Sequence, residues 1–273
     1  MRLLNNNKIY YALLAILILS LILCGVDYAN CGNITLDFVY VGRGDAAMLN
    51  LPRKKHILLD SGEGGGEYDS GIYTYIKKRG VKKIDAFILS HYHSDHGGAV
   101  AELLGTMKVA ALFLPALPDG ETNWLHDEII RANKTAKVYY IKSPITIKTE
   151  NGVSLSVIYF DNSIGEENER SVVWRLDAGK TALFTGDIGV KTEAAMLAAG
   201  ADVDSDILKV PHHGSKNSSS AAFLEAVSPD LAVICVGPNS YGHPAPETLA
   251  RLDALGVTTV RTDVKGTYRV KMN

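Results

Sequence analysis

Metal-binding side chains are concentrated in one short segment, HYHSDHGG, which covers residues 91–98. His91 and His93 stand two positions apart, so on an extended turn they point to the same side and can bind one ion. Asp95 and His96 fall on the expected first turn of a helix, where they face a second ion. The spacing therefore predicts two metal sites that lie close to each other.

Acidic and imidazole side chains also follow directly after apolar runs at other points in the chain. Proteins of the α/β class bind ligands beyond the carboxyl ends of their strands, so we expect these side chains to line one edge of the sheets. One histidine at a strand end is more often a hydrogen-bonded structural residue than a ligand, but several such sites together indicate a metal centre. They are Asp60 in LLDSG, Asp187 in FTGDIG, His212 and His213 in VPHHGS, and His243 in YGHP.

The two carboxylates at strand ends differ in their expected roles. Asp187 is the natural bridge between two divalent ions, which at roughly 3.5–4 Å apart would activate water and neutralise a phosphoryl oxygen. Asp60 is expected to accept a hydrogen bond from a metal-bound imidazole and to fix its tautomer, or else only to close a turn to Gly62. Imidazole ligands suit zinc and carboxylates also suit manganese, so we expect two divalent ions, Zn²⁺ or Mn²⁺.

The order of apolar runs and turn residues predicts an α/β protein with two sheet-rich halves and helices outside them. The runs at 34–41, 45–51 and 55–60 indicate three consecutive strands that begin an antiparallel sheet. Residues 143–160 and 171–187 each have the pattern of a β-hairpin. A last hairpin is expected around Val264 to Gly266, and helices are expected near 72–79, 97–107, 123–133, 191–199, 220–226 and 246–255.

The composition describes a folded globular protein without a strong charge bias. Its 273 residues are 47% hydrophobic, and the formal net charge of −2 gives no general signature of polyanion binding. The basic runs at 53–55 and 77–83 are expected to be solvated surface. Candidates for a local basic groove are Arg43, Arg170, Lys209 and Lys216.

The N-terminal residues have the pattern of an export or membrane-anchoring segment. Two basic residues in MRLLNNNK precede an uncharged apolar run, Ile9–Val26, which has roughly the length that crosses a bilayer as one helix. No suitable pair of small residues marks a cleavage site, so we expect residues 1–32 to be a retained anchor. The alternatives are lipid attachment at Cys24 and a signal segment of a secreted protein. The preceding basic residues then leave 33–273, a single domain, outside the cytoplasm.

The motif HxHxDH followed by two glycines, with LLDSG before it and FTGD after it, resembles that of the metallo-β-lactamase-fold hydrolases over nearly all of residues 33–273. Within that superfamily, VGRGDAAML, ILKVPHHGSKNSSS, VGPNSYGHP and RTDVKGTYRV look most like the hydrolase domain attached to the DNA-uptake channel proteins of natural competence. The resemblance implies a four-layered αββα sandwich with a metal site at one edge. It also implies a metal-dependent hydrolase, with a phosphodiesterase or nuclease acting on extracellular DNA as the first hypothesis.

One segment departs from the pattern of that superfamily. Many members supply a histidine ligand shortly before the FTGD hairpin, whereas the segment EENERSVVW has Asn168 and Ser171 in that place. We expect these two polar side chains to support the metal site from behind its ligands. One ion therefore lacks a ligand unless a later segment provides it.

The later histidines are expected to complete the site. His213 is either a ligand in place of His212 or the acid that protonates the leaving group. With the metal-binding carboxylates Asp95 and Asp187, it makes up the candidate catalytic set. The metal assignments are His212 to the ion of His91 and His93, and His243 to the ion of Asp95 and His96.

Substrate binding is less well defined by the sequence. Ser215 and Lys216 could hold a substrate phosphate, or Ser215 caps a helix and Lys216 is simply exposed. A nuclease should have a basic groove of strand width beside the metals, whereas a small-molecule hydrolase should have a closed apolar pocket.

Two alternatives to a nuclease remain open. One is a hydrolase of another outside substrate, such as phosphorylcholine or another cell-wall phosphodiester, or a lactam. The other is a metal-binding module without catalysis, against which the intact HxHxDH and FTGD motifs argue. DNA or another phosphodiester and the membrane are the expected partners, and no protein partner is inferred.

The apolar run predicts how the intact protein behaves in cells. We expect the full chain to sediment with the membrane fraction and to be digested by protease added outside the cell, because its anchor places residues 33–273 beyond the cytoplasm. Immunoblotting of the fractions checks both outcomes, with a cytoplasmic protein as the control. A chain that resists the external protease would show that the orientation is wrong.

Overall fold

Two packed sheets and their outer helices make up the described part of the protein, a computed structural model. The structure describes residues 32–64, 71–149 and 151–273, together with positions 16, 18 and 20. Nearly all of the predicted anchor, Ile9–Val26, therefore lies outside the described residues. No helix within the described ranges is long and apolar enough to cross a membrane.

The first sheet joins an antiparallel half to a parallel half. In the described chain it has seven strands, in the spatial order β16 (Tyr268–Lys271), β1 (Thr35–Phe38), β2 (Ala47–Leu51), β3 (Lys55–Leu59), β5 (Ala86–Ile88), β7 (Ala111–Pro115) and β8 (Lys137–Ile141). Strands β1, β2 and β3 pair in antiparallel register, which confirms the predicted start of the sheet. From β3 to β8 all neighbours run parallel, so their carboxyl ends meet at one edge.

The second sheet repeats this plan with the later part of the chain. Its seven strands among the described residues are β15 (Thr258–Arg261), β14 (Leu231–Ile234), β13 (Ile207–Lys209), β12 (Lys180–Phe184), β11 (Val173–Ala178), β10 (Ser154–Tyr159) and β9 (Thr146–Lys148). Strands β12 to β15 are parallel. The predicted hairpins are confirmed as the antiparallel pairs β9–β10 and β11–β12.

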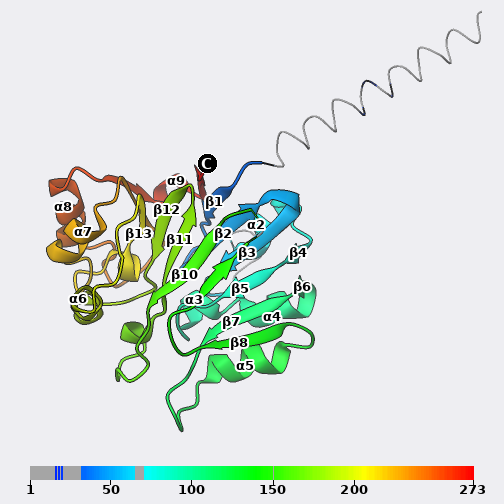
Figure 1. The fold of residues 1–273 in the computed structure, drawn as a ribbon, viewed down its shortest axis with the longest axis horizontal. Coiled ribbons are helices and arrows are strands. Elements are labelled where there is room, and N and C mark those ends of the chain that lie inside the picture. Colours follow the sequence, from blue (N-terminus) through cyan, green and yellow to red (C-terminus); the bar gives the residue numbers. More distant parts are fainter. Residues whose placement is uncertain (1–15, 17, 19, 21–31, 65–70, 150) are drawn as a thin grey trace, which may run out of the picture.

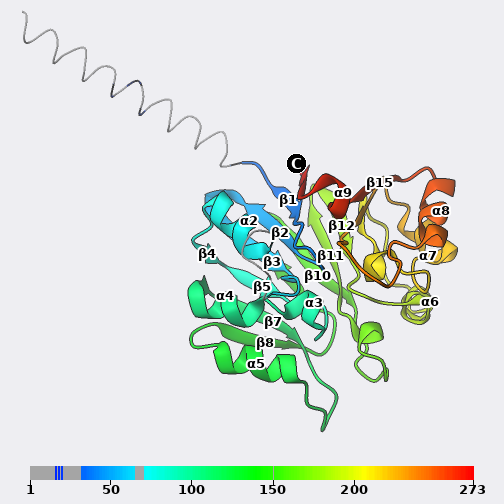
Figure 2. The ribbon, with the colours of Figure 1, turned by 180° about the vertical axis from the view of Figure 1, so that it is seen from behind.

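Helices cover the outer face of each sheet (Figure 1, and from behind in Figure 2). Three of them pack on the first sheet, α2 (Ile72–Arg79), α4 (Val100–Thr106) and α5 (Trp124–Ala132). Three others pack on the second sheet, α6 (Val190–Ala198), α7 (Ala221–Val227) and α8 (Pro246–Ala254). The layers follow the order helix, sheet, sheet, helix, so the expected αββα sandwich is confirmed. The short elements are η1 (Pro52–Lys54), β4 (Lys83–Ile84), α3 (Ser94–Gly97), β6 (Lys108–Val109), η2 (Asn168–Arg170), η3 (Pro211–Gly214) and α9 (Thr262–Lys265).

The inner faces of the two sheets meet in an apolar layer. Phe38 of β1 and Phe184 of β12 stack with their ring centroids 6.1 Å apart, and Trp174 of β11 is buried in the same cluster. Successive side chains of a strand point to opposite faces, so the central strands pack inward on the other sheet and outward on the helices. This two-sided burial fixes the register of the strands, and with it the position of the residues that follow them.

The predicted final hairpin around Val264 to Gly266 is wrong. Strand β15 pairs in parallel with β14 in the second sheet, whereas β16 pairs antiparallel with β1 in the first. Between them the chain forms α9 and turns at Gly266, where φ is +69°, and so crosses from one sheet to the other. A local turn signal marks a change of direction, but it does not specify which sheet the next strand joins.

The first and last described residues of the domain meet at the edge opposite the carboxyl ends of the parallel strands. The Asn273 side chain donates from Nδ2 to Gly32 O at 2.7 Å and accepts from Ile34 N at 3.0 Å. Strand β1 begins at this edge, because β1, β2 and β3 alternate in direction and β3 ends at the other edge. The chain therefore enters and leaves the domain far from the residues that follow β3 and β5.

The contact between the sheets predicts a large effect on stability. Phe38 is fully buried and stacks on Phe184, so Phe38→Ala should lower the free energy of unfolding by about 3–5 kcal/mol through the cavity that it leaves. Val264→Ala is the control, because Val264 is 69% exposed and its truncation should change stability by less than about 0.5 kcal/mol. Urea unfolding measures both variants. Equal midpoints would show that the stacked rings contribute little.

Candidate metal centre

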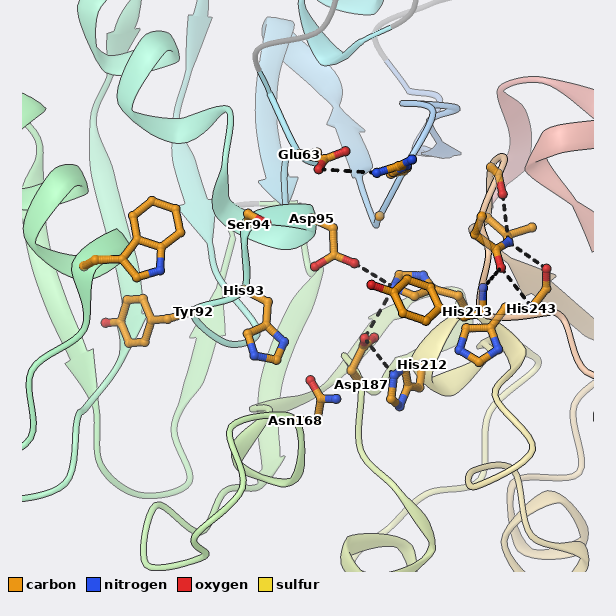
Figure 3. Close-up of a pocket in the computed structure, with 17 residues that line it drawn as sticks. Glu63, Tyr92, His93, Ser94, Asp95, Asn168, Asp187, His212, His213 and His243 are labelled. Atoms are coloured by element: carbon orange, nitrogen blue, oxygen red, sulfur yellow. Dashed lines mark hydrogen bonds and ion pairs between the residues drawn. The ribbon is translucent and has the colours of Figure 1, made fainter.

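Side chains from both sheets meet at the edge where the parallel strands end. Figure 3 shows Asp187 between His93 on one side and His212 and His213 on the other. The residues that the sequence singles out at strand ends therefore converge in space. They follow β3 (Asp60), β5 (His91 to His96), β12 (Asp187) and β13 (His212 and His213).

His91 and His93 lie together after β5. His93 precedes helix α3 with extended backbone, and its Nδ1 is 3.1 Å from His91 Nε2. Burial, and after it the positive charge of His96, lowers the pKa of His91 well below its usual value. A neutral imidazole is the form that binds a metal, so His91 and His93 can bind one ion together.

His96 is oriented by Asp60 behind it. His96 Nδ1 donates to Asp60 Oδ2 at 2.8 Å, and Asp60 also accepts from the backbone N–H and the hydroxyl of Ser90, each at 2.8 Å. These bonds direct His96 Nε2 toward Asp187 Oδ1, 3.2 Å away. Asp60 thus makes the contact expected of a carboxylate that fixes a ring tautomer.

Asp95, His96, Asp187 and His213 form a four-ligand group, in which one atom from each residue lies within 4.8 Å of the others. His213 Nε2 is 3.2 Å from Asp95 Oδ2 and 3.3 Å from Asp187 Oδ2. Burial alone would raise the pKa of Asp187, but the charges of His213, His96 and Lys209 hold it well below its usual value. The Asp187 carboxylate is therefore ionised, as metal binding requires.

The adjacent histidines of VPHHGS take different places. Both have left-handed backbone, with φ of +50° at His212 and +52° at His213, a conformation that costs a non-glycine residue about 1–3 kcal/mol. His213 Nδ1 donates to Cys235 O at 2.8 Å, which aims its Nε2 at the four-ligand group. His212 Nε2 lies 3.9 Å from Asp187 Oδ2, and the His212 ring packs 5.6 Å from the ring of His243.

This arrangement differs from the assignment made on the sequence. The histidine beside Asp95 and His96 is His213, whereas His243 contacts His212 on the pocket wall. The difference arises from the left-handed turn at His212 and His213. A residue distant in the sequence stabilises this turn, because His212 N donates to the carbonyl of Gly186 at 3.2 Å. Nothing in the pair HH itself indicates such a turn.

A buried ion pair, Lys209 with Asp45, lies behind the ligands. Lys209 is 3% exposed and donates to Gly186 O at 2.9 Å, so its predicted place in a basic groove is wrong. Its Nζ pairs with Asp45 Oδ2 and lies 3.5 Å from Asp187 Oδ1. Asp45 Oδ1 is 3.2 Å from His213 Nδ1. The sequence does not single out Asp45 as a site residue, because Asp45 precedes a strand, β2, and the candidate residues were those that follow strands.

Ser171 supports the backbone of a predicted ligand. Its Oγ accepts from Asp187 N at 3.0 Å and donates to Asn168 O at 2.8 Å. Asn168 itself lines the pocket in front of the ligands. Ser171 therefore contacts Asp187 from behind the ligands, as expected, whereas Asn168 lies at the pocket and not behind them.

Ser215 and Lys216 do not line that pocket. Ser215 is buried, its Oγ accepts from Asn217 N at 3.3 Å, and its carbonyl accepts from Thr248 Oγ1 at 2.8 Å. Lys216 is exposed to solvent. The exposed Lys216 matches the structural alternative. Ser215 does not, because its Oγ binds the N–H of Asn217 in a turn, and the side chain that caps the next helix, α7, is that of Ser220.

A pocket of about 470 Å³ lies in front of the ligands. Besides histidines, Tyr92, Trp124 and Tyr241 line it, and Trp124 is 62% and Tyr241 81% exposed. Of the four residues predicted for a basic groove, only Arg43 lines the pocket, and its guanidinium lies 3.9 Å from Glu63. The pocket is therefore rich in aromatic rings and only weakly basic.

The cluster fits a divalent ion. Among the described residues, the buried atoms His96 Nε2 and Asp187 Oδ1 have no hydrogen-bond partner, although they are only 3.2 Å apart. A buried polar atom without a partner costs roughly 1–3 kcal/mol, and an ion bound to both atoms removes that cost. Imidazole and carboxylate ligands together suit Zn²⁺ or Mn²⁺, so a divalent metal is the group that these residues can hold.

Residues 39–237 match the family model described as the metallo-beta-lactamase superfamily. The chain belongs to this superfamily. The resemblance of its motifs to the metallo-β-lactamase-fold hydrolases is thereby confirmed, and the His and Asp cluster lies where the parallel strands of this fold end. The protein is therefore a member of a superfamily of metal-dependent hydrolases.

The chain is also similar to proteins of bacterial competence. It is 27% identical to ComE operon protein 3 of Bacillus subtilis, in a match that covers 86% of this chain and 33% of that protein. Competence protein ComA of Neisseria gonorrhoeae is 30% identical, with 82% of this chain and 30% of that protein covered. Recombination protein 2 of Haemophilus influenzae is 29% identical, with 86% and 28% covered. The chain spans about a third of the length of these relatives.

The positions of the adjacent histidines predict different effects of their removal. His213→Ala should lower the metal content by about one ion per chain, because His213 Nε2 faces both Asp95 and Asp187. His212→Ala should keep the full metal content, because His212 lies outside the four-ligand group. Elemental mass spectrometry of the purified variants measures both. Metal loss in the His212 variant alone would reverse the two roles.

Proposed function

We propose that the protein is a metal-dependent phosphodiesterase that cleaves DNA outside the cytoplasm. This proposal rests chiefly on the fact that members of both ligand groups, His93 of one and Asp95 and Asp187 of the other, line the pocket, so ions held by these groups would face the substrate. Phosphodiester hydrolysis uses such an ion to polarise the phosphoryl oxygen and to activate water. The uncharged run at residues 9–26 supports the location.

The residues of the site have distinct roles in this reaction. The His91/His93 pair would hold one ion and the four-ligand group the other. Asp187 belongs to the four-ligand group and also lies close enough to His91 for its charge to act on the pKa of that histidine. The protein supplies the geometry, because Asp60 fixes the ring of His96 through the bond at 2.8 Å. The ions, when bound, stabilise the charge that develops on the phosphoryl oxygens.

His212 is placed to move a proton. It lines the pocket beside Asp187 without belonging to the four-ligand group. Burial lowers its pKa below the usual value, so its imidazole is neutral near pH 7. A neutral imidazole at this position can accept a proton from the attacking water through Nε2.

Aromatic rings and one guanidinium support a nucleic acid as the substrate. Trp124 and Tyr241 line the pocket and are largely exposed, and rings of this kind stack on bases with about 1–3 kcal/mol per base. Arg43 at the same wall can contact a phosphate. Two relatives carry competence or recombination in their names, which supports DNA over other phosphodiesters.

A choline ester of the cell wall is the second candidate substrate. Tyr92, Trp124 and Tyr241 line one pocket, and aromatic faces attract a quaternary ammonium group. With Arg43 as its one Lys or Arg lining residue among the described positions, the pocket also offers less positive charge than a long DNA strand commonly meets.

The test uses the full chain, purified in detergent and loaded with Mn²⁺ or Zn²⁺. We expect cleavage of single-stranded DNA and of bis(p-nitrophenyl) phosphate, and no cleavage after chelation. Asp187→Asn should slow both reactions by more than about 100-fold, since even outer partners of metal ligands are worth 10–100-fold. Asp253→Asn is the matched control, because Asp253 is an exposed aspartate of α8, and it should keep the wild-type rate.

Two further substrates complete the assay, double-stranded DNA and p-nitrophenyl phosphorylcholine. Cleavage of the choline ester without cleavage of DNA would favour the second candidate. Full metal loading without hydrolysis of any of the four substrates would contradict the proposal and leave a metal-binding module without catalysis.

A further inference from the structure

The side chain of Asn168 has an unexplained polar atom. Its Oδ1 is buried and has no hydrogen-bond partner within the part of the chain that the structure describes. Asn168 lines the pocket together with His93 and Asp187, and Figure 3 shows it next to the space between these two residues. A buried carbonyl oxygen without a donor is rare in folded proteins and calls for a partner.

The residues that flank Asn168 in the sequence are hydrogen-bonded to both segments that carry metal ligands. Glu167 Oε1 accepts from the N–H of Tyr92, the residue between His91 and His93, at 3.0 Å. On the other side, Ser171 Oγ accepts from Asp187 N at 3.0 Å.

Glu169 adds a further attachment beyond Asp187. It is buried, and its Oε2 accepts from Gly189 N and from Thr192 N, each at 3.1 Å. The turn η2 is therefore tied to both segments that carry ligands, and Asn168 lies between the attachments.

The His91/His93 pair is short of protein ligands. Metal sites with catalytic roles commonly have three protein ligands and keep one position open. His213 does not supply the third, because its Nε2 faces Asp95 and Asp187. Asp187, the expected bridge, belongs to the four-ligand group and would be shared by both ions, so the pair has no third ligand of its own. A donor on the pocket wall next to His93 can supply one.

We propose that Asn168 Oδ1 is the third protein ligand of the ion held by His91 and His93. An amide oxygen is a neutral, hard donor of the kind that divalent ions accept from asparagine side chains. It replaces the histidine that many members of the superfamily have in this segment. Besides any oxygen from a bridging Asp187, the site then has two imidazole nitrogens and one amide oxygen. It favours zinc over manganese less strongly than a site with three imidazoles does.

The proposal rests on one part of the proposed function, the binding of metal ions, and not on the choice of substrate. Its test therefore measures metal binding and not DNA cleavage. The full chain is stripped with a chelator and titrated calorimetrically with Zn²⁺ and, separately, with Mn²⁺. Asn168→Ala should weaken the binding of one of two ions by about 100-fold or more. Asn168→His should bind zinc at that site about tenfold more tightly than the native chain, with no matching gain for manganese.

Controls separate the loss of a ligand from the loss of the fold. Asn217→Ala removes an exposed asparagine and should leave both affinities unchanged, and thermal melting of the stripped proteins checks that each variant folds. If Asn168→Ala does not fold, Asn168→His and Asn168→Asp decide the matter, because both supply a donor of similar size. Unchanged affinities in these two variants would overturn the proposal.

A substrate contact is the competing role for the amide. If Asn168→Ala binds both ions as tightly as the native chain and only raises the KM for a phosphodiester, Asn168 contacts the substrate and the proposal is wrong. Loss of one ion in a chain that fails to cleave DNA would support the ligand role and contradict only the choice of substrate.

Discussion

Buried carboxylates and the positive charges that neutralise them constrain the whole structure. Asp45, Asp60 and Asp187 are 5%, 6% and 3% exposed, and an ionised carboxylate buried without a partner is strongly destabilising. Asp45 and Asp60 come from the first sheet, whereas Lys209, which pairs with Asp45, comes from the second. The observed packing of the two sheets pairs these charges, and the same packing brings the metal ligands together.

The charges in this cluster are of two kinds. Burial alone would lower the pKa of Lys209, but Asp45 and Asp187 raise it above its usual value, so the lysine stays charged. His96 and His213 are different, because they can exchange a proton for a metal ion. Lys209 thus keeps its positive charge, whereas the positive charge of His96 and His213 is replaced when a metal binds. Lys209 neutralises part of the negative charge of the carboxylates whether or not a metal is bound.

Local patterns predicted the elements well, and long-range contacts account for what they missed. A helix is predicted near 72–79, and α2 covers these residues, because its apolar spacing and the glycine-rich loop before it are local signals. The change of sheet after α9 and the left-handed turn at His212 and His213 depend on contacts with distant strands. In the site, spacing within the chain identified the candidate ligands, but which histidine joins Asp95 depends on backbone that the sequence does not specify.

The hydrogen bonds that join Asn273 to Gly32 and Ile34 would have a consequence if the residues before Gly32 attach the protein to a surface. They place the entry of the chain at the edge of the sandwich opposite the pocket. A tether at Gly32 would hold the pocket at the distal pole of the domain, facing away from its point of attachment. Long polymers could then enter from the surrounding medium without passing beneath the domain, and the length of the tether would set how far the pocket reaches.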